Sequence, residues 1–440
     1  MKTGKLLVST AALALALGAA SASAQTIKIG FISSYSGLNG NLGPYMERGA
    51  RLYLKEHAKE LPAGVKIEFL IRDDTGPNPD KAKQLAQELI VRDKVDFLAG
   101  VIFTPNAMAM APLATEAKVP FIIMNAGTAV ITTRSPYIAR LSFTLWQSCY
   151  PLGQWAAKKF KRAYTMVSDF GPGHDCEDAF VRASKEAGGN VVGTVRVPLV
   201  NPDFVPYMQR VKDAKPDALM VFIPAGKTAT AVLKAFGELG LAKAGVKLIG
   251  PGDVTTDEEL ENMGDAALGA LTVHHYSAAA TRPANQAFVA AWKREYGANE
   301  TPNFVAVGGW DGMAAMVYAI KGQNGKLNPD RTMELLKQFK EPDSPRGPIS
   351  IDPATRDIVQ NEYLRGCAGS AVSSSTSSSR PWALRSRIPG RNCRRRSSNS
   401  GHRGCASAPD YVGAMERTLG RRSSHRKYEA RCTVVHRAFF

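Results

Sequence analysis

The sequence predicts an α/β protein of two lobes, each with a largely parallel sheet. Short apolar runs alternate with segments of helical pattern from residue 26 to residue 340, which is typical of repeated β-α units. Right-handed crossovers between such units give parallel strands. The chain of 440 residues also exceeds the size of one ordinary hydrophobic core, so we expect two domains.

The first β-α series supplies the first lobe. Its expected strands are residues 26–33, 65–71, 95–101, 119–124 and 136–141, and its expected helices are 43–57, 79–92 and 107–117. Asn78 followed by Pro79 is a typical helix start. The loop with Gly37, Gly40 and Gly43 lacks the dinucleotide-binding spacing, so we interpret it as a flexible loop at the rim of a cleft.

The second β-α series supplies the second lobe. Its expected strands are residues 163–168, 190–197, 217–223, 246–249 and 269–275, and its expected helices are 147–161, a segment ending near 187, 204–214 and 225–240. Helices over 285–296, 303–320 and 330–340 and an antiparallel ribbon follow. Crossings near 141–147, 272–278 and 350 predict a multi-strand hinge. We therefore expect residues 25–144 and 275–350 in lobe 1, and residues 145–274 and 351–365 in lobe 2.

Two polar turns of lobe 1 are expected to form an anion site. Neighbouring parallel strands end at the same sheet edge, where open α/β sheets bind ligands, and a helix N-terminus there favours an anion. Thr104 has a second possible role as the N-cap of the following helix, and both roles are compatible. The turns are Phe103-Thr104-Pro105-Asn106 and Asn125-Ala126-Gly127-Thr128.

Residues 1–24 have the form of a cleaved export signal. Lys2 and Lys5 precede a short apolar stretch, and the segment ends on Ala22-Ser23-Ala24. The apolar stretch is too short to span a bilayer, so we expect an exported periplasmic protein without membrane insertion.

The composition changes abruptly after Arg365. Residues 366–440 contain 15 Lys and Arg against 3 Asp and Glu, so this tail carries +12 of the net charge of +17. The charge therefore gives no reason to expect a nucleic-acid partner for the rest of the chain. A basic arm that binds RNA or a membrane surface and simple disorder are alternatives. We favour a reading-frame shift, because residues 367–383 can be back-translated so that a shifted frame encodes QLVNVEFETV, which alternates like an edge strand. We accordingly predict residues 366–440 to be a disordered, non-native tail.

No motif in the sequence requires a metal, a cofactor or covalent catalysis. The consecutive residues His174 to Asp178 cannot all face one ion on a helix. We interpret Asp73 and Asp74 as capping residues, and His274-His275-Tyr276 as part of a hinge or cleft rim. G-x-S-x-G, H-E-x-x-H and C-x-x-C are absent, so we predict a protein that is not an enzyme. Export permits a Cys149–Cys176 disulfide, but the sequence leaves its formation open.

A series of motifs follows in order between residue 27 and residue 364: YSG, AGVIFTPNAMAMAPLA, VPFIIMNAGTA, VSDFGPG, KPDALMVF, LIGPGDV and GWDGM. In this order they resemble periplasmic solute-binding proteins of the branched-chain amino acid (Leu/Ile/Val) importer type. The resemblance implies the type I periplasmic-binding fold, in which two Rossmann-like lobes close on a ligand by hinge motion. It further implies transport, with an ABC permease and its ATPase as partners, and a monomer.

The resemblance also implies which residues bind the ligand. The positions that match the carboxylate contacts of the family are Thr104, Ala126 and Thr128, flanked by Phe103 and Asn125 in the same turns. Leu42 occupies the place of an aromatic residue in the first loop, with Tyr35 nearby. Asp253 is one position displaced from the usual partner of a ligand ammonium group, and the family's aromatic residues around Pro172 and Pro224 are expected to be replaced.

These departures leave the ligand open between a branched-chain amino acid and an aromatic acid without an amino group. A ligand-sensing protein of the same fold, which presents its ligand to a receptor, is an alternative function. A hydrolytic enzyme is a further and weaker alternative.

Overall fold

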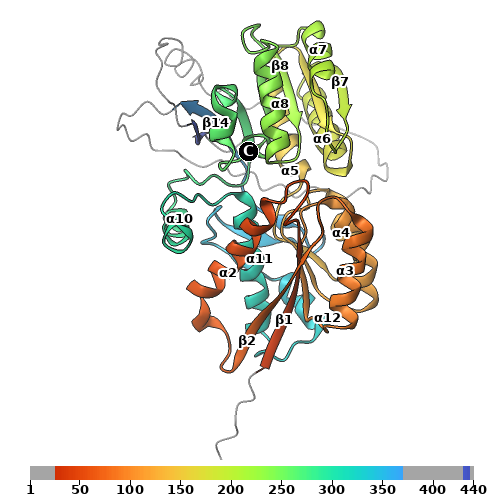
Figure 1. Cartoon of the computed structure of the whole chain (residues 1–440), viewed down its shortest axis with the longest axis vertical. Helices are drawn as coiled ribbons and strands as arrows, with labels where there is room; N and C mark the ends of the chain where they lie inside the picture. Colours follow the sequence, from red (N-terminus) through yellow and green to blue (C-terminus); the bar gives the residue numbers. More distant parts are fainter. Residues whose placement is uncertain (1–24, 370–429, 437–440) are drawn as a thin grey trace, which may run out of the picture.

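The computed structural model, which describes residues 25–369 and 430–436, has two lobes stacked along its long axis (Figure 1). Both lobes contain a sheet whose first five strands in chain order are parallel, arranged second-first-third-fourth-fifth. This order is that of a doubly wound α/β sheet. The expectation of an α/β fold with two parallel-sheet lobes is therefore confirmed.

Lobe 1 has helices on both faces of its sheet. The strands are β1 (Gln25–Ser33), β2 (Val65–Asp73), β3 (Phe97–Gly100), β4 (Phe121–Ile123) and β5 (Ile138–Arg140). Its helices are α2 (Leu42–Glu56), α3 (Pro79–Val91), α4 (Thr104–Glu116), α10 (Pro283–Tyr296), α11 (Phe304–Lys321) and α12 (Pro329–Leu336). One face of the sheet packs on α3 and α4, and the other packs on α2 and α11. Gly49 and Gly309 allow α2 and α11 to approach closely, because a Cβ atom at either would lie about 2 Å from a carbonyl oxygen of the other helix.

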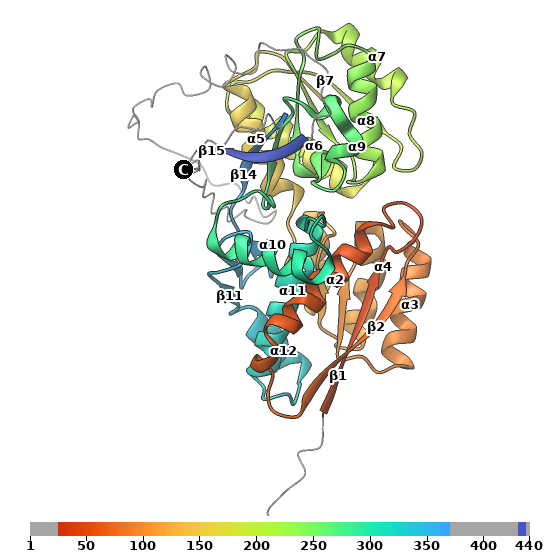
Figure 2. The same ribbon diagram turned by 60° about the vertical axis from the view of Figure 1, so that its left-hand side comes forward.

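Lobe 2 contains a seven-stranded sheet with an antiparallel edge. Its strands are β6 (Ala163–Ser168), β7 (Val191–Val197), β8 (Ala218–Phe222), β9 (Lys247–Pro251), β10 (Leu271–His274), β14 (Tyr363–Gly369) and β15 (Ala430–His436). β14 pairs antiparallel with β10, and β15 pairs antiparallel with β14, as Figure 2 shows at the lobe's edge. The helices are α5 (Leu145–Ala157), α6 (Gly171–Glu186), α7 (Val205–Ala214), α8 (Lys227–Glu238) and α9 (Leu260–Met263).

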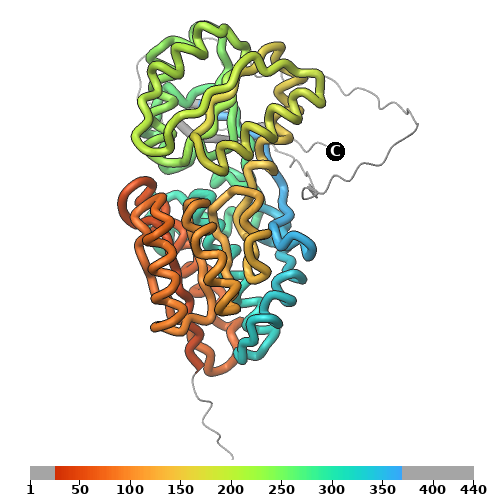
Figure 3. Tube along the Cα trace, turned by 90° about the vertical axis from the view of Figure 1, so that its right-hand side faces the viewer, coloured from red at the N-terminus to blue at the C-terminus, as the bar shows by residue number. Residues whose placement is uncertain are grey.

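The chain passes between the lobes after β5, after β10 and before β14, and these connections lie along one side of the molecule (Figure 3). A small sheet of β11 (Lys340–Glu341), β12 (Ile349–Ile351) and β13 (Ile358–Val359) precedes the third connection. It is bound to lobe 1, because the Arg140 N–H donates to the Arg356 carbonyl at 3.0 Å and Arg140 Nε pairs with Asp357 Oδ1 at 2.7 Å. The third passage thus follows Val359, later than the position near 350 expected from the sequence.

The C-terminal tail enters the structure at two places. Gly366–Gly369 continue β14, and residues 430–436 form β15, so these residues differ from the predicted disorder. Cys367 is 3% exposed within the core of lobe 2. The remainder of the predicted tail and the predicted signal segment, residues 1–24, lie outside the described residues. Among the helices that are described, none has the length and apolar character needed to cross a membrane.

Cys149 and Cys176 form a disulfide that joins α5 to α6 across a separation of 27 residues. Such a link restricts the unfolded chain, so the double variant Cys149→Ala, Cys176→Ala is expected to lose ~3 kcal/mol of unfolding free energy. Urea unfolding followed by circular dichroism measures this loss. A midpoint equal to that of the wild type would contradict a stabilising role.

Candidate functional site

A cavity with an empty volume of about 380 Å³ lies between the lobes. Lobe 1 and the first crossing provide Asn39, Leu42, Ile102, Phe103, Asn125, Gly127, Phe143, Leu145 and Phe304, and lobe 2 provides Phe170, Pro172, Phe222, Pro224, Ala225 and Asp253.

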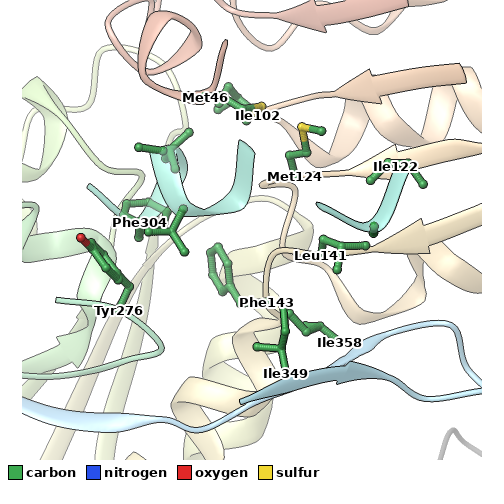
Figure 4. Packing of buried hydrophobic residues seen from close by; sticks show 14 of the residues in the cluster. Met46, Ile102, Ile122, Met124, Leu141, Phe143, Tyr276, Phe304, Ile349 and Ile358 are labelled. Atoms are coloured by element: carbon green, nitrogen blue, oxygen red, sulfur yellow. The ribbon is translucent and has the colours of Figure 1, made fainter. Parts of the chain in front are cut away.

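Five of the fifteen residues that line the cavity are phenylalanines. Phe143 and Phe304, which Figure 4 shows as neighbours, have ring centroids 5.9 Å apart in an edge-to-face arrangement. Phe170 and Phe222 of lobe 2 stack with centroids 6.0 Å apart. Aromatic side chains arranged in this way favour a further ring between or against them. The cavity is therefore suited to a small, flat, apolar group.

Helix N-termini give the same cavity an affinity for negative charge. Phe103 is the N-cap of α4 and Phe170 is the N-cap of α6, and both line the cavity. Neither helix has a side-chain cap, and α8, which starts after the lining residue Ala225, also has none. The first N–H groups of a helix lack partners within it, and its dipole attracts anions. An organic anion is the ligand that these helix ends favour.

Four of the predicted site residues line the cavity: Leu42, Phe103, Asn125 and Asp253. Asn125 Nδ2 donates to the Ile102 carbonyl at 3.0 Å, while its Oδ1 atom has no hydrogen-bond partner among the described residues. Phe103 and Asn125 follow β3 and β4, so this edge of the cavity lies where parallel strands end, and ligand contact for these residues stays a prediction.

The other four lie beside the cavity and not on its wall. Thr104 and Thr128 share a hydrogen bond of 2.9 Å between their hydroxyl oxygens. A Cβ atom on Gly171 of lobe 2 would lie 2.8 Å from Thr128 Oγ1, so the two threonines meet the opposite lobe at the interlobe seam. The Ala126 N–H donates to the Val101 carbonyl at 3.1 Å.

Tyr35 is held by its own lobe. Its hydroxyl donates to Glu47 Oε2 at 2.7 Å. The hydroxyl group thus forms a hydrogen bond within lobe 1, and a contact between Tyr35 and the ligand stays a prediction.

Asp253 extends into the cavity from the short helical turn after β9, Gly252–Thr255. The Arg365 guanidinium fixes this turn by donating to the carbonyls of Gly252 at 3.1 Å and Thr255 at 3.4 Å. Burial raises the pKa of Asp253 to about 7, although the positive charge of Arg365 acts to lower it. Burial therefore favours the protonated, neutral form of this carboxyl group.

His274 and His275 lie behind the aromatic wall and are fully buried at the end of β10. The His274 ring is 5.3 Å from Phe143 and 4.6 Å from Phe304, measured between centroids. Burial lowers the pKa of both histidines well below the ordinary value, so both are neutral. The expected hinge location fits their place at the second crossing.

Several lining residues were not predicted. Phe170 and Phe222 line the cavity close to Pro172 and Pro224, so the expectation that aromatic residues are missing there was wrong. Both lie where β6 and β8 end, and applying the strand-end rule to lobe 2 would have identified them. Phe143 and Phe304 come from a crossing and a helix start, for which the sequence has no such signal.

Two residues of the stretch His174 to Asp178, where no metal site is expected, make other contacts. Asp175 Oδ2 accepts from the Ala129 N–H at 2.7 Å, and Cys176 is in the disulfide. Within the described part of the chain, no group of three or more His, Cys, Asp or Glu side chains is arranged to hold a metal ion.

Comparisons with known proteins agree with this architecture. The profile of a family described as periplasmic binding protein matches residues 26–370. The Leu/Ile/Val-binding protein homolog 6 of Brucella melitensis is 40% identical over 365 residues, which cover 83% of this chain and 93% of that protein.

Two solved structures are also similar. A solute-binding protein of an ABC transporter from Rhodopseudomonas palustris BisB5, in complex with 3,4-dihydroxy benzoic acid, is 50% identical with a TM-score of 0.75, and the match covers 79% of this chain and 94% of that one. A second solute-binding protein from R. palustris, in complex with 4-hydroxybenzoate, is 42% identical with the same TM-score and the same coverage of both chains. The names of these relatives describe binding proteins for transport, not enzymes.

Proposed function

The chain belongs to the periplasmic binding protein family, and from this premise we propose that it captures a small aromatic carboxylate in the periplasm for an ABC importer. The observation that carries the proposal is the interlobe cavity, where five phenylalanines surround a space into which uncapped helix N-termini open. The ring of the ligand would lie among the aromatic side chains, and its carboxylate would accept hydrogen bonds from helix-start N–H groups and polar side chains such as Asn125.

The similar solved structures support this choice of ligand. Two solute-binding proteins that are 50% and 42% identical to the chain hold hydroxylated benzoic acids. The name of the Brucella relative instead suggests a branched-chain amino acid, and Asp253 is the acidic residue of the cavity wall that such a ligand would present its ammonium group to. Titration with both classes of ligand therefore decides between the two candidates.

Contacts between the lobes suggest how occupancy would be signalled. The Ala129 N–H of lobe 1 donates to Asp175 of lobe 2, and Thr128 packs on Gly171. We propose that these contacts, with Thr104 beside them, stabilise a closed form around the ligand, which the permease and its ATPase then recognise. In this role the protein acts as a monomer without covalent chemistry.

A ligand screen tests the proposal. The exported protein is titrated with benzoate, hydroxybenzoates, hydroxycinnamates, leucine, isoleucine and valine in thermal-shift and calorimetric experiments. At a ligand concentration 100 times Kd, an aromatic acid is expected to raise the free energy of unfolding by ~2.7 kcal/mol. The proposed ligand class would be refuted if leucine, isoleucine or valine gave a heat of binding and raised the melting temperature while none of the aromatic acids did.

A further inference from the structure

The carboxyl group of Asp253 has no partner that explains its burial. Its residue is 6% exposed and lines the cavity, yet its Oδ2 atom lacks a hydrogen-bond partner among the residues that the structure describes. Burying a polar group without a hydrogen bond destabilises a protein, and such groups in native structures call for an explanation. A ligand group is the natural partner, because Asp253 lines the ligand cavity.

The neighbours of Asp253 supply no hydrogen bond to its Oδ2 atom among the described residues. Arg365 is engaged with backbone carbonyls of the turn and donates to the Tyr276 carbonyl at 3.0 Å. His274 Nε2 is 3.8 Å from Asp253 Oδ2, which is too long for a hydrogen bond, and neither nitrogen of this imidazole has a partner in the described part of the chain. Two atoms at this separation can both form hydrogen bonds to one oxygen that lies about 2.8 Å from each of them.

Electrostatics determines which end of a ligand meets Asp253. Two carboxylates do not share a buried site without one of them taking up a proton. The anionic end of an aromatic acid is therefore expected at the start of α4 and beside Asn125 in lobe 1, while Asp253 of lobe 2 faces the substituents of the ring.

Chemistry favours a hydroxyl group over an ammonium group at this position. An ammonium group would need an ionised carboxylate, and burial opposes ionisation by raising the pKa of Asp253 to about 7. The nearby positive charge of Arg365 also disfavours a second cation. A phenolic hydroxyl is neutral, and it donates to a carboxylate as readily as it accepts from a carboxylic acid.

We infer that Asp253 is the specificity-determining residue that recognises a ring hydroxyl of the bound aromatic acid, with the His274 imidazole as a second hydrogen-bonding partner. This inference rests on the proposed function. A site built to pair with a hydroxyl discriminates strongly against the analogue that lacks it, because its buried polar atoms are then left unpaired.

The test compares benzoate with the three monohydroxybenzoates by isothermal titration calorimetry. We expect the wild type to bind the best monohydroxybenzoate about 10- to 100-fold more tightly than benzoate. In Asp253→Leu this ratio is expected to fall to within about threefold of unity, because the carboxyl group is removed while benzoate keeps its other contacts. Benzoate binding in the variant reports that the variant is folded.

Two further variants complete the design. Asp253→Ala removes the carboxyl group without adding bulk, and its preference for the hydroxybenzoate over benzoate is expected to fall as in Asp253→Leu. This second variant keeps the test decisive if the leucine side chain of the first obstructs the cavity. Asp265→Leu, at an exposed acidic residue of the same lobe, is expected to keep the wild-type ratio.

Different outcomes would refute the role of Asp253 and the proposed aromatic-acid function. If the wild type and both Asp253 variants bind benzoate and hydroxybenzoates with the same ratio, Asp253 does not recognise the hydroxyl, although the aromatic-acid function stands. If the wild type binds leucine, isoleucine or valine and no aromatic acid, the proposed function fails, and loss of that binding in the Asp253 variants would assign Asp253 to the ammonium group.

Discussion

Replacing Ala225 with Trp is expected to abolish ligand binding and to leave the fold intact. Ala225 is 3% exposed and lines the cavity just before α8, where the helix start approaches the ligand space. An indole side chain at this position occupies much of a cavity of about 380 Å³ and thereby excludes the ring of a ligand. Steric exclusion of this kind should weaken binding at least ~100-fold, measured by calorimetry with the best aromatic acid of the screen.

The matched control for this variant is Ala231→Trp. Ala231 lies on the same helix and is exposed, so the same change of side chain there adds no bulk to the cavity. This variant should bind like the wild type, and the circular dichroism spectra of both variants should match that of the wild type. Normal affinity in a folded Ala225→Trp variant would show that the ligand binds elsewhere.

The periodicity of the sequence predicted the strands and helices well, because each β-α unit is encoded locally. The first residue of α4 is an example of what this local periodicity did not predict. The apolar composition predicts a helix from residue 107, but α4 begins at Thr104, with Phe103 as N-cap and Pro105 in the first turn. Proline is favoured there because its missing N–H is not needed, and the composition of the helix interior does not carry that signal.

The candidate site was predictable only where local rules apply. Phe103 and Asn125 follow strands and lie on the cavity wall, as the strand-end rule implies. Phe143 and Phe304 are 161 positions apart in sequence, and they meet because the first crossing passes the start of α11. Contacts of that kind depend on how the crossings pack, which a single sequence does not reveal.

In the C-terminal tail, composition did not predict where ordered structure ends. The change in composition at residue 366 suggested that ordered structure ends there, yet β14 continues to Gly369. A strand is held by backbone N–H and C=O groups, which residues of almost any composition supply. Composition therefore located the change in sequence character, but not the end of the sheet.

The largest expected loss of stability comes from the buried ion pair between Arg346 and Asp311. Arg346 Nε lies 2.6 Å from Asp311 Oδ2, and neither side chain has exposed surface. Arg346 also donates to the carbonyls of Leu141 at 3.1 Å and Ser142 at 2.8 Å, and to Gln360 Oε1 at 2.9 Å. The guanidinium group thus joins the first crossing, the third crossing and α11 at one point of the hinge.

Removing one partner of this pair should be more harmful than removing both. Arg346→Met leaves Asp311 buried without its countercharge, which is expected to cost about 3–5 kcal/mol of unfolding free energy. The double variant Arg346→Met, Asp311→Leu replaces both charges with apolar groups and should recover much of that loss, because it no longer buries an unpaired charge. Urea unfolding of the wild type, both single variants and the double variant measures the coupling between the two residues.

The same four proteins reveal whether the pair also controls hinge closure. Since Arg346 holds two crossings together, the double variant should bind ligand more weakly than the wild type even where its stability is restored, because the closed form is no longer fixed at that point. If the double variant binds ligand with the affinity of the wild type, the Arg346–Asp311 pair contributes to stability and not to closure of the hinge. A loss of unfolding free energy in the double variant equal to the sum of the two single losses would instead show that the two residues act independently.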